Sequence, residues 1–197
     1  HRASTQSLSI GPAAYVLNAD AALANYDTIS NVPTTEIIRY TLTNGLVAET
    51  DLYNASGSNE YWTHASEAGY GLIIPGTNIY AVFGRSGMHN SGGSYGVDAC
   101  GFQGHCSNDP NDNYPYYWLY DVDDMIAVKN GSMQPYEIIP TDQGQLNVPF
   151  KTNSNPGVVG GAFDPSQNKL YLMLHEEDTL QGVAATPIII VYDLGAV

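Results

Sequence analysis

The chain has 197 residues, of which only 13% are charged, against roughly 25% in typical soluble domains. Asp and Glu number 20 while Lys and Arg number 6, so the formal net charge is −14 at pH 7. Such a surface repels nucleic-acid phosphates and anionic headgroups, and no run of about 18 apolar residues occurs, so nucleic-acid and membrane partners are excluded.

The polarity of the chain is carried by Asn, Ser, Thr, Gly and 15 Tyr rather than by charge, which is typical of secreted β-rich proteins. The composition therefore predicts a secreted, extracellular protein. The first ten residues, HRASTQSLSI, lack the basic and then apolar segments of a secretory leader, so a leader is either already removed or was never there. The length suffices for one sizeable core, and we expect residues 1–197 to form a single domain.

Almost the whole chain has the pattern of short β-strands separated by Gly, Pro, Asn and Asp. The exception is the Ala-rich segment 18–27, NADAALANYD, which predicts about two turns of helix. The predicted strands cover residues 13–18, 36–42, 46–53, 70–75, 78–84, 116–122, 135–140, 158–164, 169–175 and 187–194. This succession predicts an all-β fold.

Two segments of the chain resemble one another at an offset of 90 residues: GLIIPGTNIYAVFG, which begins at Gly71, and GAFDPSQNKLYLMLH, which begins at Gly161. The matching residues are Gly71, Pro75 and Asn78 in the first segment and Gly161, Pro165 and Asn168 in the second. Each segment predicts a β-hairpin with a Pro/Asn turn. Glycine in the first strand of each hairpin lets neighbouring backbones approach closely there.

A further strand ending in Tyr-Asp follows each hairpin, as WLYDV at residues 118–122 and as IVYDL at residues 190–194. Repeated four-stranded antiparallel sheets are typical of β-propeller blades, here over residues 1–68, 69–145 and 146–197. Three blades are too few for a propeller, which usually has about four to eight. The ring is completed by further blades of a longer chain, by association of copies, or by TQSLSI closing the last blade. The alternative fold is a β-sandwich.

Five blocks of the sequence together resemble a group of uncharacterised secreted bacterial proteins, in which similar blocks form the C-terminal part of a predicted β-propeller. The blocks are VFGRSG, the Cys-containing loop, YPYYWLYDVDDMIAVKNG, GGAFDPSQNKLYLML and PIIIVYDL. The resemblance covers about residues 69–194, whereas the first 35 residues show none. It implies a propeller and export, and it transfers no catalytic residue.

The aromatic strand at residues 116–122 has two interpretations. Tyr116, Trp118 and Tyr120 project from one face of a strand, where they either fill the space between blades or offer Tyr116 and Trp118 to a carbohydrate. The acidic DVDD that follows, residues 121–124, predicts a structural turn in which Asp caps backbone N–H groups. We favour packing for the rings.

The long insert between residues 85 and 115 is the segment where we expect recognition, because loops beyond about 12–15 residues are uncommon unless functional or disordered. Arg85 is expected to pair with a buried carboxylate or to bind an anionic ligand. His89 follows Ser86 closely enough to suggest a nucleophile and base, although a glycine-rich loop does not preorganise them. Arg85 and His89 are therefore candidate ligand-binding residues.

The same insert carries a candidate calcium loop and a cysteine pair. Asp109, Asn111 and Asn113 alternate as oxygen ligands do in Ca²⁺ loops, while a plain polar turn is the alternative. Cys100 and Cys106 predict a disulfide that closes a small loop, or a metal site together with the adjacent histidine.

The sequence predicts an extracellular binding or structural module rather than an enzyme, with carbohydrate, other blades or copies of itself as partners. The alternative is a polysaccharide hydrolase or lyase that uses carboxylates such as Asp121, Asp124 or Glu176. In the segment LHEEDT, which begins at Leu174, His175 lies beside three acids. This pattern predicts an acidic loop or an acid/base pair on Glu176 or Glu177.

Overall fold

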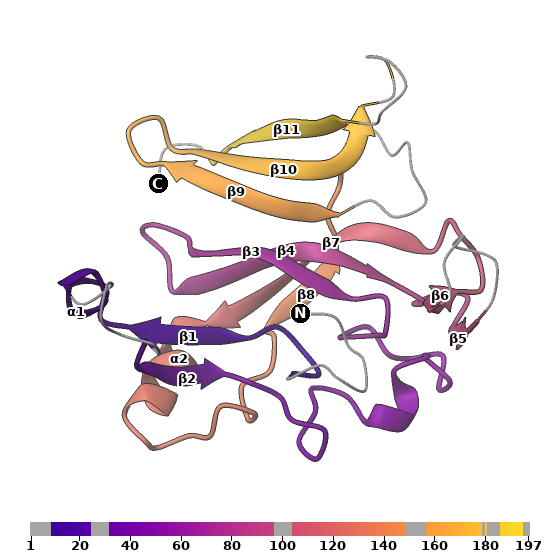
Figure 1. Cartoon of the computed structure of the whole chain (residues 1–197), viewed down its shortest axis with the longest axis horizontal. Helices are drawn as coiled ribbons and strands as arrows, with labels where there is room; N and C mark the ends of the chain where they lie inside the picture. Colours follow the sequence, from indigo (N-terminus) through magenta and orange to yellow (C-terminus); the bar gives the residue numbers. More distant parts are fainter. Residues whose placement is uncertain are drawn as a thin grey trace.

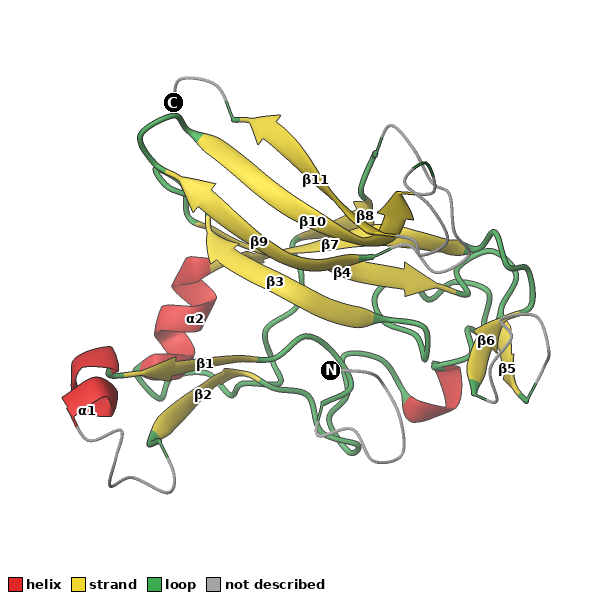
Figure 2. Ribbon diagram, turned by 45° about the horizontal axis from the view of Figure 1, so that its top comes forward, coloured by secondary structure: helices red, strands yellow, loops and turns green. Residues whose placement is uncertain are grey.

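The computed structural model describes residues 9–24, 32–96, 104–148, 157–178, 180 and 186–194. These residues form small antiparallel sheets stacked in layers, with short helices only at the margins (Figures 1 and 2). The all-β class predicted from the sequence is therefore confirmed. The described strands form four separate open sheets, and none of these closes into a barrel or a ring.

The first layer contains a two-stranded antiparallel ribbon, β1 (Ala14–Leu17) and β2 (Thr34–Ile38), with helix α1 (Ala19–Ala24) after β1. The predicted helix is thus present in the described part of its range. The predicted strand at residues 46–53 is wrong, because a 3₁₀ turn, η1 (Glu49–Asp51), occupies it.

Local hydrogen bonds from side chains to the backbone explain that failed strand. The Asp51 carboxylate accepts the Ser56 N–H at 2.8 Å, and the Asn54 side chain accepts the Asn59 N–H at 2.9 Å. Asp, Asn and Ser compete with sheet ladders in this way, so the segment turns instead of extending.

The central layer is a four-stranded sheet in the order β3 (Glu67–Ile73), β4 (Ile79–Gly87), β7 (Asn113–Asp121) and β8 (Asp142–Gln145). The third layer is a sheet of β9 (Val158–Asp164), β10 (Lys169–Asp178) and β11 (Thr186–Asp193), with β10 in the middle. A small side hairpin, β5 (Gly93–Tyr95) and β6 (His105–Ser107), extends from the insert between β4 and β7.

The central and third sheets repeat the same pairing register. Gly71 pairs with Val82 in the central sheet, and Gly161 pairs with Leu172 in the third. The Tyr-Asp strands of the two sheets also have the same register. The first residue of the preceding strand pairs with the Asp in both, Ile79 with Asp121 and Lys169 with Asp193. The self-similarity of the sequence is therefore a structural repeat of two meanders, each of three strands.

The element after the first Tyr-Asp strand differs from the predicted turn. Asp121 accepts the Asp123 N–H at 2.8 Å, so it caps a backbone group as expected, but what it caps is helix α2 (Val122–Lys129). Sequence analysis missed this helix because it is only eight residues long and buries one side chain, Val128, so it has hardly any apolar face.

The fourth strand of the central sheet also lies later than predicted. Residues 135–140, PYEIIP, form a turn in which Gln134 N–H donates to the Glu137 carboxylate at 2.7 Å. Ile138 from this turn is fully buried in the core, so its apolar pattern reflects burial without strand pairing. The strand itself, β8, pairs with β7 through Tyr117 and Trp118.

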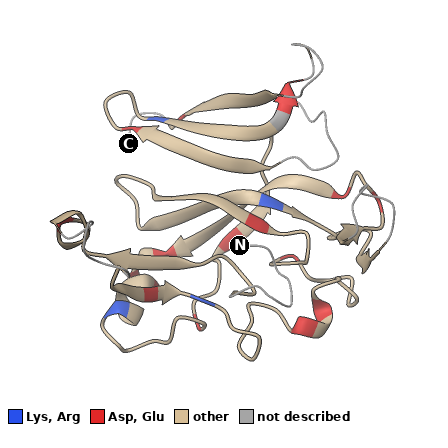
Figure 3. Ribbon diagram, in the orientation of Figure 1, with Lys and Arg blue, Asp and Glu red and all other residues tan. Residues whose placement is uncertain are grey.

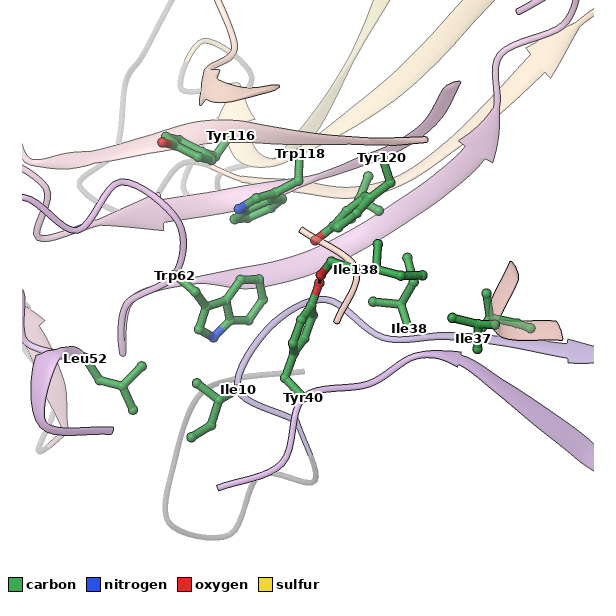
Figure 4. Close-up of a cluster of buried hydrophobic side chains, with 12 residues drawn as sticks. Ile10, Ile37, Ile38, Tyr40, Leu52, Trp62, Tyr116, Trp118, Tyr120 and Ile138 are labelled. Carbon is green, nitrogen blue, oxygen red and sulfur yellow. Dashed lines mark hydrogen bonds between the residues drawn. The ribbon is translucent and has the colours of Figure 1, made fainter. Parts of the chain in front are cut away.

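Two apolar cores cover the two faces of the central sheet. One lies between that sheet and the N-terminal layer, and Figure 4 shows its rings converging around Trp62, Trp118 and Tyr40. The other lies between the central and third sheets, where Phe83 belongs to the same buried cluster as Leu172 and Ile190. The central sheet is therefore buried on both faces, as a middle layer must be.

Trp118→Ala is expected to lower the free energy of unfolding by about 3–5 kcal/mol, because it leaves a cavity in the first core. It also removes the Nε1–H bond to the Tyr61 carbonyl oxygen at 2.6 Å. Denaturant unfolding measures the loss. Leu23→Ala on α1, where Leu23 is 71% exposed, serves as the control and should change stability by no more than about 0.5 kcal/mol. Equal stabilities of the two variants would contradict this assignment of the core.

Candidate functional site

A cleft of about 380 Å³ opens where the central and third sheets meet at one edge. Its lining includes Glu67, Gly69, Arg85, Gly157, Val158 and His175. The sheets approach one another closely beside it, since a Cβ on Gly69 would collide with the carbonyl oxygen of Val158. Glycine at this position of β3 is what allows β9 to approach so closely.

An ion pair forms one wall of the cleft. Arg85 Nη2 lies 2.8 Å from Glu67 Oε2, and the two residues are cross-strand partners in β3 and β4. The Arg85 side chain is 16% exposed, whereas that of Glu67 is 38% exposed. The sequence predicted that Arg85 would pair with a carboxylate, and this carboxylate lies at the cleft surface instead of being buried. Across the described chain, acidic residues are spread over loops, helices and strands, and basic residues are few (Figure 3).

The other side of the cleft is lined by residues of the second meander, Gly157, Val158 and His175. At the offset of 90 residues, Arg85 corresponds to His175 and Glu67 corresponds to Gly157. The backbone N–H of His175 donates to the Gly157 carbonyl oxygen at 3.0 Å. His175 and Gly157 are therefore neighbours across the third sheet, as Arg85 and Glu67 are across the central sheet. His175 is exposed, and it lies next to Leu174, which is buried in the core between the two sheets. The two repeats therefore both contribute residues to the lining of one cleft, with the Arg85 guanidinium as its charged donor.

His89 belongs to a buried hydrogen-bond chain and not to this cleft. Its Nδ1 lies 2.9 Å from the Asn59 carbonyl oxygen, to which it donates, and its Nε2 lies 2.7 Å from Ser86 Oγ. Burial lowers the pKa of His89 and favours the neutral ring. Ser86 is 1% exposed and also contacts Ser66 Oγ at 2.6 Å, so a substrate has no access to it. The pair is structural.

Tyr116 and Trp118, the candidate carbohydrate platform, lie in the interior. Trp118 is fully buried, and the Tyr116 hydroxyl donates to the Glu60 carbonyl oxygen at 2.8 Å. Both polar ring groups therefore have backbone partners within the fold, and neither ring offers a face to solvent. This placement favours the packing interpretation over sugar stacking.

The candidate calcium residues form a polar turn. Asp109 Oδ1 accepts the Asn111 N–H at 2.8 Å, and the Asn113 side chain contacts both Ser107 Oγ and the Pro110 carbonyl oxygen. Among the described residues, no group of three or more His, Cys, Asp and Glu side chains is placed to hold a metal ion. The oxygens of the predicted Ca²⁺ loop are thus engaged with their own turn.

The neighbouring Asp112 organises the insert. It is 3% exposed and accepts hydrogen bonds from Tyr114 Oη, from the Asn90 N–H, and from both the N–H and the hydroxyl of Ser91. Burial opposes its ionisation, but these hydrogen bonds outweigh that effect and hold the pKa of Asp112 below its usual range. Burial and the same carboxylate raise the pKa of Tyr114 to about 12.

A second cavity, of about 300 Å³, lies against a histidine pair that sequence analysis missed. His64 and His105 stack with ring centroids 3.9 Å apart, and the Tyr53 hydroxyl lies 2.6 Å from His105 Nδ1. Burial and the nearby His64 lower the pKa of His105. These residues come from separate segments with no shared motif, so no signal in the sequence pointed to the pair.

The cysteine predictions fall partly outside the described residues. Cys106 is buried in β6, whereas Cys100 lies in the range that the structure does not describe, so the disulfide stays a prediction. The metal alternative relied on the histidine beside Cys106, and that ring is engaged with Tyr53.

Of the carboxylates of the predicted hydrolase or lyase, the described Asp121 and Asp124 do not line the cleft. Asp121 caps α2 and also accepts Asn78 Nδ2–H at 2.6 Å, at the far end of β4 and β7 from Arg85. Six residues of extended strand separate these ends, roughly 20 Å. Asp124 lies in the first turn of α2 and Glu177 is buried, while the Glu176 side chain is outside the described part.

Comparison of this chain with family models, curated proteins and solved structures finds no match. Of the helices that the structure describes, none is both long and apolar enough to cross a bilayer.

Asp112→Asn is expected to lower the free energy of unfolding at pH 7 by about 1–3 kcal/mol, because an amide cannot accept all four donors. Since the folded pKa of Asp112 is lowered, its stabilising effect is present above the unfolded pKa of about 3.9 and is lost as pH falls through the folded value. The difference between wild type and variant should therefore narrow below about pH 4.

Denaturant unfolding between pH 3 and 7 measures this difference, with the exposed Asp109→Asn as the matched control. The control should stay within about 0.5 kcal/mol of wild type. A constant gap between wild type and Asp112→Asn across this pH range would contradict the ionised, hydrogen-bonded carboxylate.

Proposed function

We propose that the chain is an extracellular binding module built from propeller-type blades, which holds a small polar ligand in the cleft between two of them. The observation that carries this proposal is the cleft itself, which residues of two register-matched meanders line and in which the ion pair of Arg85 and Glu67 forms one wall. Its volume of about 380 Å³ lies within the range of about 300–1,000 Å³ found for small-molecule sites.

The arrangement of the sheets supports blades over a two-layer sandwich. The closest contact between the central and third sheets involves their first strands, β3 and β9, at Gly69 and Val158. Propeller blades approach most closely at their inner strands, next to the axis. The described layers number three, so a closed ring requires further blades from a longer chain or from other copies. The acidic, Tyr-rich composition and the resemblance of residues 69–194 to secreted proteins support an extracellular location.

The chemistry of the cleft favours a ligand with an anionic group. Arg85 provides a planar set of N–H donors suited to a carboxylate. Glu67 accepts from Arg85 across the strand pair and can accept from a ligand hydroxyl when Arg85 turns to the ligand. Small hydroxylated acids, such as uronic acids, combine these groups.

Titration with D-glucuronate and D-galacturonate, followed by heteronuclear NMR, tests the site, with D-glucose as the neutral comparison. We expect the acids to shift resonances of cleft residues and Arg85→Ala to weaken their binding by at least about tenfold. Arg39→Ala is the matched control, because Arg39 also pairs with a glutamate, Glu36, but on β2 outside the cleft lining. Equal binding by Arg85→Ala and wild type, or no binding of either acid, would contradict the proposed ligand site.

A further inference from the structure

The outer face of the third sheet is apolar and lies away from both described cores. Side chains alternate along its strands, so Leu172 and Ile190 face the central sheet while Met173, Ile189 and Val191 face outward. Ile189 is 63% exposed and Val191 is 51% exposed, and their cross-strand partners on this face are Met173 and Tyr171. Contiguous apolar rows of this kind mark an interaction surface more often than scattered exposed residues do.

The equivalent face of the central sheet is the one that packs against the third sheet. In the central sheet, the four positions equivalent to the outward-facing ones form two cross-strand pairs. They are Ala81 with Leu119 and Phe83 with Tyr117. All four pack into the core against the third sheet. The outer face of the third sheet therefore continues the established interface between sheets by one repeat.

We propose that this outer face binds the same face of a second copy of the chain, so that two third sheets pack across a two-fold axis. Two observations select this occupant. First, in the described residues, the opposite face of each meander is already buried within the chain. That face carries Trp118 in the central sheet and Leu172 in the third sheet. A copy can thus offer its own outer face, and self-complementary contacts of this type are the commonest in oligomers.

Second, the charge distribution permits such a contact between two strongly acidic copies. The charged residues of β9, β10 and β11 lie toward the strand ends and not along the middle of the strands (Figure 3). Lys169, Asp164 and Asp193 lie together at one end, where β10 pairs with both neighbours. The centre of the face is uncharged, so two copies can meet without opposing carboxylates.

The ribbon β1–β2 also carries exposed apolar side chains, but it is a poorer interface. Val16 is 45% exposed and Leu17 is 48% exposed, yet they pair with Thr35 and Thr34. Each face of this two-stranded ribbon is therefore mixed and narrow, whereas the outer face of the third sheet is three strands wide.

Light scattering after size exclusion, over a range of protein concentrations, tests the proposal on the intact chain. We expect a mass of twice 21.2 kDa at high concentration. The double variant Ile189→Thr/Val191→Thr, which keeps β-branched residues and a folded sheet, should raise the dimer dissociation constant by at least about tenfold.

The matched control is Val16→Thr/Leu17→Thr on the ribbon, which should dimerise as wild type does. Circular dichroism verifies that both variants are folded. A wild type that stays at 21.2 kDa at every concentration, or a dimer that the control variant weakens and Ile189→Thr/Val191→Thr does not, would overturn the proposal. The result is independent of the cleft, because ligand binding is measured through Arg85 and dimerisation through light scattering.

Discussion

The structure depends on one constraint, which is that a small twisted sheet with two apolar faces must have both of them covered. The central sheet presents Trp118 and Tyr120 on one side and Phe83 on the other, and these side chains are buried. Neither face can be solvated without exposing large apolar area at about 25 cal/mol per Å². The N-terminal layer and the third sheet supply the two covers, so the layers stabilise one another.

The cleft follows from the same stacking. Where β3 and β9 meet, glycine lets the backbones approach, and just beside this contact Arg85 and Glu67 line an open space. Residues of two separate hairpins therefore line a single cleft. In the described part of the insert between β4 and β7, Asn90 and Ser91 donate to Asp112, and these residues do not line the cleft.

Much of the fold could be predicted from the sequence, because spacing alone revealed the repeat. Gly, Pro and Asn recur at the same positions of both hairpins, and the pairing of Gly71 and Gly161 has the same register. Two strands were predicted where none forms. At one, the side chains of Asp51 and Asn54 bond to the backbone and form a turn; at the other, the apolar pattern around Ile138 reflects burial and not strand pairing.

The site was harder to predict than the fold. Arg85 was a candidate from the sequence, but the cleft that it lines depends on how two sheets pack, and Glu67 carried no motif. The buried rings of Tyr116 and Trp118 followed the favoured packing interpretation, since alternation along a strand predicts which residues share a face.

The most direct test of the stacked repeat is the stability of Gly69→Ala compared with Gly160→Ala. A Cβ on Gly69 collides with the Val158 backbone of the adjacent sheet, whereas one on Gly160 makes only an ordinary contact at 3.5 Å with the Met173 side chain. Denaturant unfolding should show Gly69→Ala destabilised by about 1–3 kcal/mol or more, and Gly160→Ala close to wild type. A Gly69→Ala protein as stable as wild type would mean that these two sheets do not pack at this contact.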